Sequence, residues 1–186
     1  MKTNLAAKRV LCFGDSNTWG YIPGTDHERL HPGARWTGVL QLKLGESYDI
    51  LEEGLCSRTI ATEDPRIGKE GRNGLAYIKP CLETHVPDYL VVMLGTNDCK
   101  FDYGKSPEMI GKDMRRFIEV ASGFPAFQQR RQCLLLLSPP IINDKTEYCM
   151  AGGKYKEAGE KSEALGGIYV SLAEEFGCTF QNIGAL

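Results

Sequence analysis

Apolar residues in this chain gather in short continuous runs instead of alternating with polar ones. The runs lie at Val10–Phe13, Leu90–Leu94 and Cys133–Leu137, with weaker ones at Tyr48–Leu51 and Cys178–Ile183. Continuous apolar runs are typical of parallel strands that are buried on both faces. The pattern therefore predicts a parallel sheet of five strands.

Longer stretches with helical patterning separate these runs. The sequence predicts helices over Trp36–Leu44, Gly74–Thr84, Pro107–Ala121 and Lys154–Phe176. Ser106 before Pro107 is a helix start, and Gly177 closes the last helix. Alternating strands and helices predict a doubly wound α/β fold of three layers, with helices on both faces of the sheet and residues 1–186 in one domain.

Three long polar loops remain between these elements. They cover Tyr21–Arg35, Ser57–Asn73 and Ile141–Lys154. Because loops at the carboxyl ends of parallel strands surround the binding sites of such sheets, we interpret them as walls of a site.

Composition limits the kind of partner. With 42% hydrophobic residues and a net charge of −2, the chain offers no basic surface for nucleic acid or an anionic membrane, which favours a small neutral substrate. No apolar stretch has the length of a signal peptide or a membrane span. Seven scattered cysteines without a Cys-x-x-Cys pair favour reduced thiols. We expect a cytoplasmic protein without disulfides or structural zinc, whose oligomeric state, homo-oligomer included, the sequence leaves open.

Chemically versatile residues follow two of the predicted strands directly. Gly14-Asp15-Ser16-Asn17 comes after the first run, and Gly95-Thr96-Asn97-Asp98 comes after the third. A serine at such a turn is lifted above the sheet edge, and the carboxyl ends of parallel strands meet at one edge. The sequence thus predicts one site built from both segments.

These segments resemble the first and third blocks of the SGNH (GDSL-type) hydrolases. Glu53-Gly54-Leu55-Cys56-Ser57-Arg58-Thr59 is similar to the second block, and Arg35–Leu40 and Ser138–Pro140 are similar to the small bacterial arylesterase and acyltransferase branch. The resemblance implies a flavodoxin-like strand order. It also implies a serine esterase, or an acyltransferase, that acts on small short-chain acyl esters through an acyl-enzyme, with no cofactor and no metal.

The resemblance assigns roles to individual residues. Ser16 is the expected nucleophile, and the expected oxyanion donors are the backbone amides of Ser16 and Ser57 and the side chain of Asn97. Asp15 and Asp98 are expected to hold their loops. Trp19, Tyr21 and Trp36 either wall an acyl pocket or belong to the core.

One element of the family pattern is missing. Family members activate the serine with an Asp-x-x-His block after the last strand, whereas this chain has no histidine beyond His85. We expect the catalytic Asp/His pair beyond these residues, because the sequence stops at an apolar segment just where the block should begin.

Two alternatives remain open. His27 or His31 could replace the missing histidine, whereas His85 at a predicted helix end is expected to be structural. Otherwise the chain is a catalytically impaired ligand-binding or assembly protein with the same fold.

Overall fold

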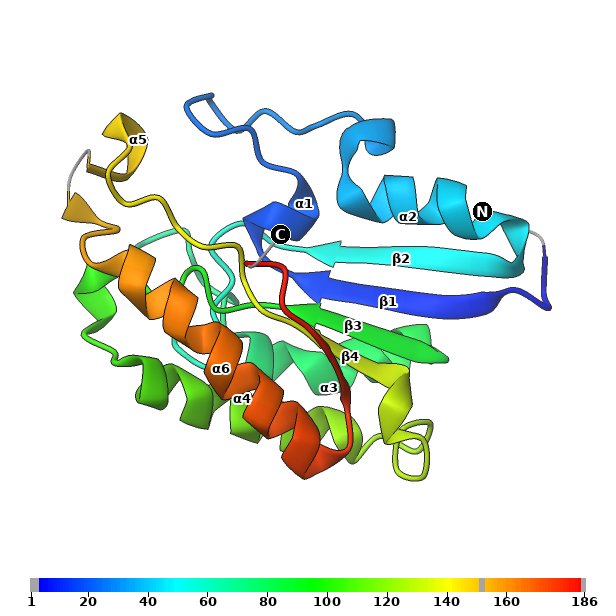
Figure 1. The fold of residues 1–186 in the computed structure, drawn as a ribbon. Coiled ribbons are helices and arrows are strands. Elements are labelled where there is room, and N and C mark those ends of the chain that lie inside the picture. Colours follow the sequence, from blue (N-terminus) through cyan, green and yellow to red (C-terminus); the bar gives the residue numbers. More distant parts are fainter. Residues whose placement is uncertain (1–3, 151–152, 185–186) are drawn as a thin grey trace.

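The computed structural model describes residues 4–150 and 153–184, and its centre is a five-stranded parallel sheet (Figure 1). The strand order is β2-β1-β3-β4-β5, and every neighbouring pair is parallel. The strands are β1 (Lys8–Gly14), β2 (Tyr48–Gly54), β3 (Tyr89–Met93), β4 (Leu134–Leu137) and β5 (Thr179–Gln181). This order confirms the predicted flavodoxin-like sheet.

Helices lie on both faces of the sheet (Figure 1). The helix α2 lies on one face, and α3, α4 and α6 lie on the other. The helices are α1 (Ser16–Trp19), α2 (Trp36–Leu44), α3 (Gly74–His85), α4 (Pro107–Ser122), α5 (Glu147–Met150) and α6 (Ala158–Phe176). Ser106 caps α4 by accepting from the Met109 amide, and Gly177 ends α6 in the left-handed conformation, as expected.

The last helix starts later than the pattern predicted. α6 begins at Ala158 instead of Lys154, because Glu157 has a φ of 62°. A left-handed residue does not continue a right-handed helix. Residues 154–157 instead extend the expected loop 141–154, of which residues 151–152 lie outside the described part of the chain.

Two apolar clusters hold the layers together. Leu11 and Phe13 of β1 point into the large cluster beneath α3, α4 and α6, whereas Val10 and Cys12 point into a smaller cluster beneath α2. Side chains alternate between the faces of a strand, so a strand that is apolar on both faces reads as a continuous run. This explains why the sheet was visible in the sequence.

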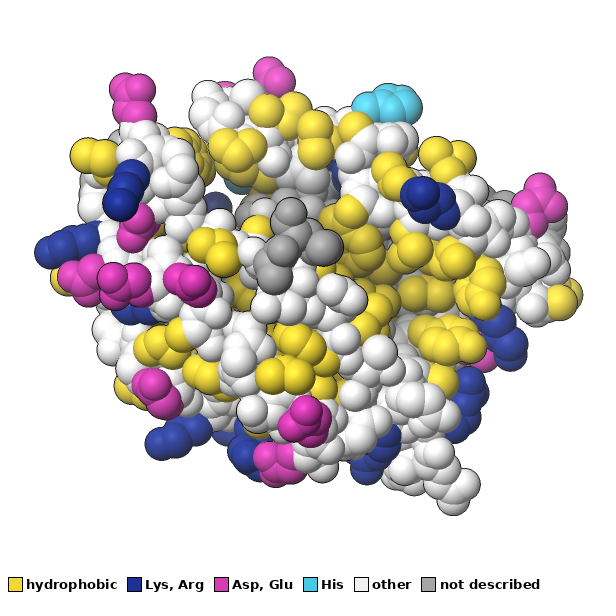
Figure 2. Space-filling view, viewed as in Figure 1, with side chains coloured by type: hydrophobic (Ala, Val, Ile, Leu, Met, Phe, Trp, Pro, Cys, Tyr) yellow, Lys and Arg dark blue, Asp and Glu magenta, His cyan; other side chains and the backbone are white. Residues whose placement is uncertain are grey.

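The described residues cover only part of the sheet face that carries α2. Beside α2 a hollow of about 330 Å³ lies over β1, β3 and β4, and hydrophobic side chains surround it (Figure 2). Its apolar lining includes Val10, Leu40, Leu44, Tyr48, Tyr89 and Leu135.

The remaining expectations concern membranes and cysteines. Among the helices of the described residues, none is long and apolar enough to cross a membrane. All seven cysteines carry free thiols.

Candidate functional site

Ser16 lies where β1 ends and the short helix α1 begins. Gly14 pairs with Gly54 of β2 and Met93 of β3, so Ser16 follows the carboxyl end of β1, the strand between β2 and β3. A Cβ on Gly14 would lie 2.1 Å from Thr18 Oγ1 and 3.0 Å from the Met93 carbonyl oxygen. Only glycine allows the turn to pack this closely against β3.

Asp15 holds the turn around Ser16. Its Oδ1 accepts from the Asn17 amide at 2.9 Å and from Asn17 Nδ2 at 3.0 Å. Asn17 Nδ2 also donates to Thr96 Oγ1 at 3.1 Å, which ties the first block to the third. Burial raises the pKa of Asp15 to about 6. The carboxyl group therefore positions the loop, which agrees with the expectation.

The second block turns over the ends of β1 and β2. The Leu55 amide donates to the Gly14 carbonyl at 3.1 Å, and the Arg58 guanidinium donates to the same oxygen at 3.0 Å. The guanidinium also bonds the Glu53 carbonyl and lies 4.1 Å from the centre of the Phe13 ring. Arg58 is only 3% exposed, and its hydrogen bonds hold the ends of β1 and β2 together.

Ser57 follows this turn in a backbone conformation that favours glycine. Its φ is 68°, and it is one of four non-glycine residues with positive φ in the described chain. This is the second-block position whose backbone amide is expected to stabilise the oxyanion. The side chain is therefore tolerated at some cost in strain, and the backbone adopts the conformation that glycine would give.

The third block contributes a buried amide and a buried carboxyl group. Asn97 is 2% exposed, and its Nδ2 donates to the Arg58 carbonyl at 2.9 Å. Both oxygens of Asp98 accept from the Ile60 amide at 3.1 Å, which anchors the chain that follows the second block. Burial raises the pKa of Asp98 to about 7. Asp98 thus holds a loop, as Asp15 does.

Ser16, Ser57 and Asn97 line a single cavity of about 170 Å³. A second, mainly apolar cavity of about 440 Å³ opens beside it and shares Ser16, Tyr21, Tyr148 and Tyr155 with the first. Ser16 therefore lies between a polar pocket and an apolar one. A reacting carbonyl at Ser16 has room on both sides.

The three aromatic residues considered as pocket walls lie in different places. Tyr21 lines both cavities. Trp19 lines neither and packs against Arg29, whose guanidinium carbon lies 5.1 Å from the ring centre. Trp36 is the first residue of α2 and packs against the smaller core cluster.

The three histidines also lie in different parts of the structure. His27 lines the cavity of Ser16, with its ring 5.9 Å from the rings of Trp19 and Tyr21. His31 accepts from the Gly33 amide at the exposed start of a short 3-10 helix. His85 is the last residue of α3, and its Nε2 lies within hydrogen-bond distance of Glu53 Oε1, at 2.8 Å. Within residues 4–150 and 153–184, no carboxylate is bonded to His27.

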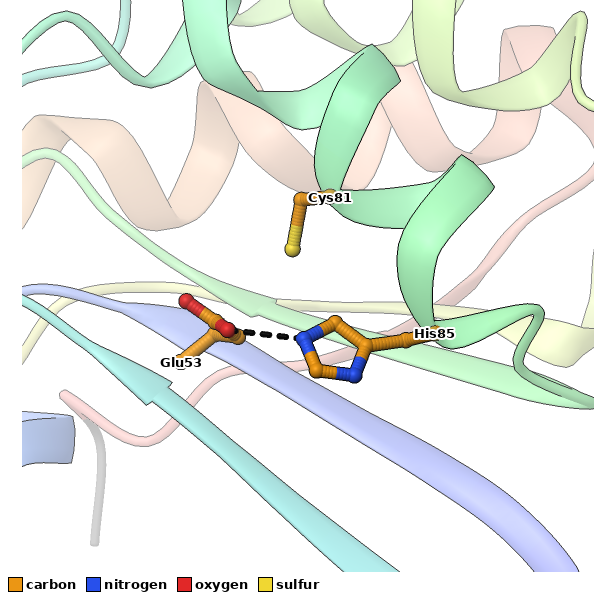
Figure 3. A group of neighbouring side chains, drawn as sticks. All are labelled: Glu53, Cys81 and His85. Atoms are coloured by element: carbon orange, nitrogen blue, oxygen red, sulfur yellow. Dashed lines mark hydrogen bonds and ion pairs between the residues drawn. The ribbon is translucent and has the colours of Figure 1, made fainter.

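Glu53, Cys81 and His85 form a group whose residue types could bind a metal ion. Cys81 and His85 lie one turn apart on α3 and face Glu53 on β2, with ligand atoms within 4.8 Å of one another (Figure 3). Sequence spacing did not indicate this group, because Glu53 joins it only through the packing of α3 on the sheet. Arg58 lies 3.9 Å from the second Glu53 oxygen and already supplies a positive charge. Burial raises the pKa of the Cys81 thiol to about 12.

Other residues of the cavity were missed at the sequence level. Its lining also includes Arg66, Lys69, Lys100, Lys154, Tyr148 and Tyr155. Arg66 and Lys69 come from the loop 57–73, Tyr148 and Lys154 come from the loop 141–154, Tyr155 follows that loop directly, and Lys100 lies two residues after the third block. Their only signal in the sequence was the interpretation of the long polar loops as walls of a site.

Known proteins share this architecture. The model of the GDSL-like lipase/acylhydrolase family matches residues 12–185. The native aryl esterase of M. smegmatis is 34% identical with a TM-score of 0.86, and the match covers 97% of this chain and 86% of that one. Est24, a carbohydrate acetylesterase from Sinorhizobium meliloti, is 34% identical with a TM-score of 0.82, covering 96% and 85%. Comparison with curated proteins gave no match.

Proposed function

Because this chain belongs to the GDSL-like lipase/acylhydrolase family and is thus a carboxylic ester hydrolase, we propose that it cleaves small, short-chain acyl esters through an acyl-enzyme on Ser16. The observation that carries this proposal is the convergence of Ser16, Ser57 and Asn97 on one cavity. Ser16 Oγ attacks the carbonyl carbon and gives its proton to a general base. The tetrahedral intermediate then expels the alcohol, and water hydrolyses the acyl-enzyme.

The oxyanion is stabilised by three donors in this proposal. They are the backbone amides of Ser16 and Ser57 and the side chain of Asn97. Asn97 Nδ2 carries two hydrogens, of which one is used by the Arg58 carbonyl, so the other is free to donate into the cavity. Each such donor typically contributes about a hundred- to a thousand-fold in rate.

The general base of the proposal is the Asp/His pair that the family places after the last strand. None of the three histidines combines a place beside Ser16 with a carboxylate partner in the described chain. The hollow beside α2 supports the same proposal, because a further helix would cover its apolar lining. We therefore propose that the base and that helix come from residues outside 1–186.

Two variants of the proposal follow from the cavities. The apolar cavity beside Ser16 can hold an alcohol while excluding water, in which case the acyl group is transferred to that alcohol. Without a base, the chain would instead bind ligands in the same cavities and not turn them over.

We also propose that the protein works in a reducing compartment such as the cytoplasm, which its seven free thiols support.

Labelling of Ser16 tests the proposal. An organophosphonate or sulfonyl fluoride should modify Ser16 alone, as mapped by peptide mass spectrometry. Ser16→Ala should abolish hydrolysis of an aryl acetate, whereas Ser47→Ala at an exposed site should retain it. Labelling at another residue, with hydrolysis surviving in Ser16→Ala, would remove Ser16 from the mechanism.

A further inference from the structure

The cavity of Ser16 carries a concentration of positive charge that the chain as a whole does not. Arg66, Lys69, Lys100 and Lys154 contribute to its lining, and no aspartate or glutamate does so among the described residues. The net charge of the chain is −2, so these cations are not part of a generally basic surface.

Lys100 is the most unusual of the four. It is 3% exposed, and its ammonium group makes no hydrogen bond or ion pair with any residue that the structure describes. Its nearest aromatic neighbour is Tyr155, with Nζ 5.9 Å from the ring centre. Burial, Lys154 and Arg66 lower the pKa of Lys100 to about 7. An ammonium group without a partner is costly to bury, so a ligand with the opposite charge would stabilise it.

Nearby carboxylates neutralise the cluster only in part, although Asp64 and Asp102 line a neighbouring cavity together with Arg66, Lys100 and Lys154. Asp64 is paired with Arg66 through two hydrogen bonds to its guanidinium. Asp15 is buried under Ser16, where Asn17 occupies one of its oxygens. Lys69 and Lys154 form no ion pair within 4 Å in residues 4–150 and 153–184. Lys69 and Lys154 therefore remain to bind an anion, and a bound anion would also favour the protonated form of Lys100.

We propose that this cavity binds an anionic group of the substrate, so the preferred substrates are acyl esters that carry a carboxylate close to the ester bond. The inference rests on the proposed function, since it uses the same Ser16. Ser16 lies at the border of both cavities, so the carboxylate would occupy the basic cavity and the uncharged remainder the apolar one. This replaces the neutral substrate favoured by the net charge.

Matched ester pairs test the proposal and locate the charge. 4-Nitrophenyl hemisuccinate and its methyl ester differ by a charge on the acyl side, and 4-acetoxybenzoate and its methyl ester differ on the leaving-group side. In at least one of the two pairs, kcat/KM should be about tenfold or more higher for the anionic ester than for its neutral partner at low salt. This preference should fall as salt is added. Equal or better cleavage of the neutral ester in both pairs would overturn the inference and leave the esterase proposal standing.

Variants that remove a positive charge test whether Lys69 and Lys154 cause the preference for anionic esters. Lys69→Gln and Lys154→Gln should each lower the anionic-to-neutral ratio of kcat/KM by about fivefold or more. Lys156→Gln is the matched control, because Lys156 is exposed, lies two residues from Lys154 and does not line the cavity. An unchanged ratio in the Lys69→Gln/Lys154→Gln double variant would overturn the assignment.

A binding measurement separates this inference from the esterase proposal. Calorimetry with succinate on the Ser16→Ala protein needs no turnover. Binding should weaken about fivefold or more in each of the Lys69→Gln and Lys154→Gln backgrounds and not with Lys156→Gln. Absence of succinate binding, or binding that is indifferent to Lys69 and Lys154, would overturn the inference even if every ester is cleaved. Binding without cleavage of any ester would instead contradict the esterase proposal alone.

Discussion

The side chain of Asn97 donates to the backbone carbonyl of Arg58 at 2.9 Å. Through this bond a residue after β3 fixes the turn that follows β2. Arg58 in turn holds the Gly14 carbonyl at the end of β1. One amide and one guanidinium thus set the relative positions of the three segments around Ser16.

Asn97 should act on the transition state more than on substrate binding, because the oxyanion exists only after attack. Asn97→Ala should lower kcat by about a hundred-fold or more with little change in KM. Steady-state kinetics on an aryl ester measures both values, and circular dichroism checks the fold. A raised KM with kcat retained would make Asn97 a binding residue.

Ser57 should contribute through its backbone and not through its hydroxyl. Because its φ of 68° suits glycine, Ser57→Gly should keep activity and change the free energy of unfolding by no more than about 1 kcal/mol. Ser57→Ala should also keep activity. Urea denaturation and esterase assays measure the two effects. Loss of activity in Ser57→Ala alone would show that the hydroxyl takes part.

Asp98 should make stability depend on pH. Burial raises its pKa from 3.8 to about 7, so the folded protein binds more protons than the unfolded one between these values. The contribution of Asp98 is therefore largest below about pH 4 and is lost as the pH rises to 7. The Tm difference between wild type and Asp98→Asn should shrink from pH 4 to pH 7. A difference that grows over this range would show that the carboxylate is stabilised in the fold.

Hydrolysis should not depend on the Glu53, Cys81 and His85 group. Serine chemistry needs no metal, and Arg58 already supplies positive charge to Glu53. Dialysis against a chelator should leave the rate unchanged, and Cys81→Ser should leave it within about twofold of wild type. Metal analysis of the purified protein completes the test. Activity that disappears with the chelator and returns with a divalent cation would make the group functional.

Without a general base, ester hydrolysis should be slow. A protein confirmed by mass to comprise only residues 1–186 should cleave an aryl acetate several orders of magnitude more slowly than relatives with the Asp-x-x-His block, since loss of the histidine costs about a million-fold in comparable triads. His27→Gln should then change little. Vigorous hydrolysis that is abolished in His27→Gln would assign the base to His27.

The sequence by itself determined the sheet and its order of elements. Strands buried on both faces have to be apolar throughout, so β1, β3 and β4 could be predicted from their continuous apolar runs. The turns that contain Gly14 and the Gly-Thr-Asn-Asp segment after β3 could also be predicted, because they depend on local geometry. A tight turn at a strand end restricts which residues can occupy it.

The tertiary structure decided what no local pattern encodes. The charge of the cavity comes from Lys69, Lys100 and Lys154, which are far apart in sequence and look like ordinary surface lysines until the loops fold over Ser16. Net charge averages over the whole chain, whereas binding depends on the few charges that share one cavity of low solvent access. Likewise, Trp19 and Trp36 resemble pocket residues in the sequence, and only packing places them elsewhere.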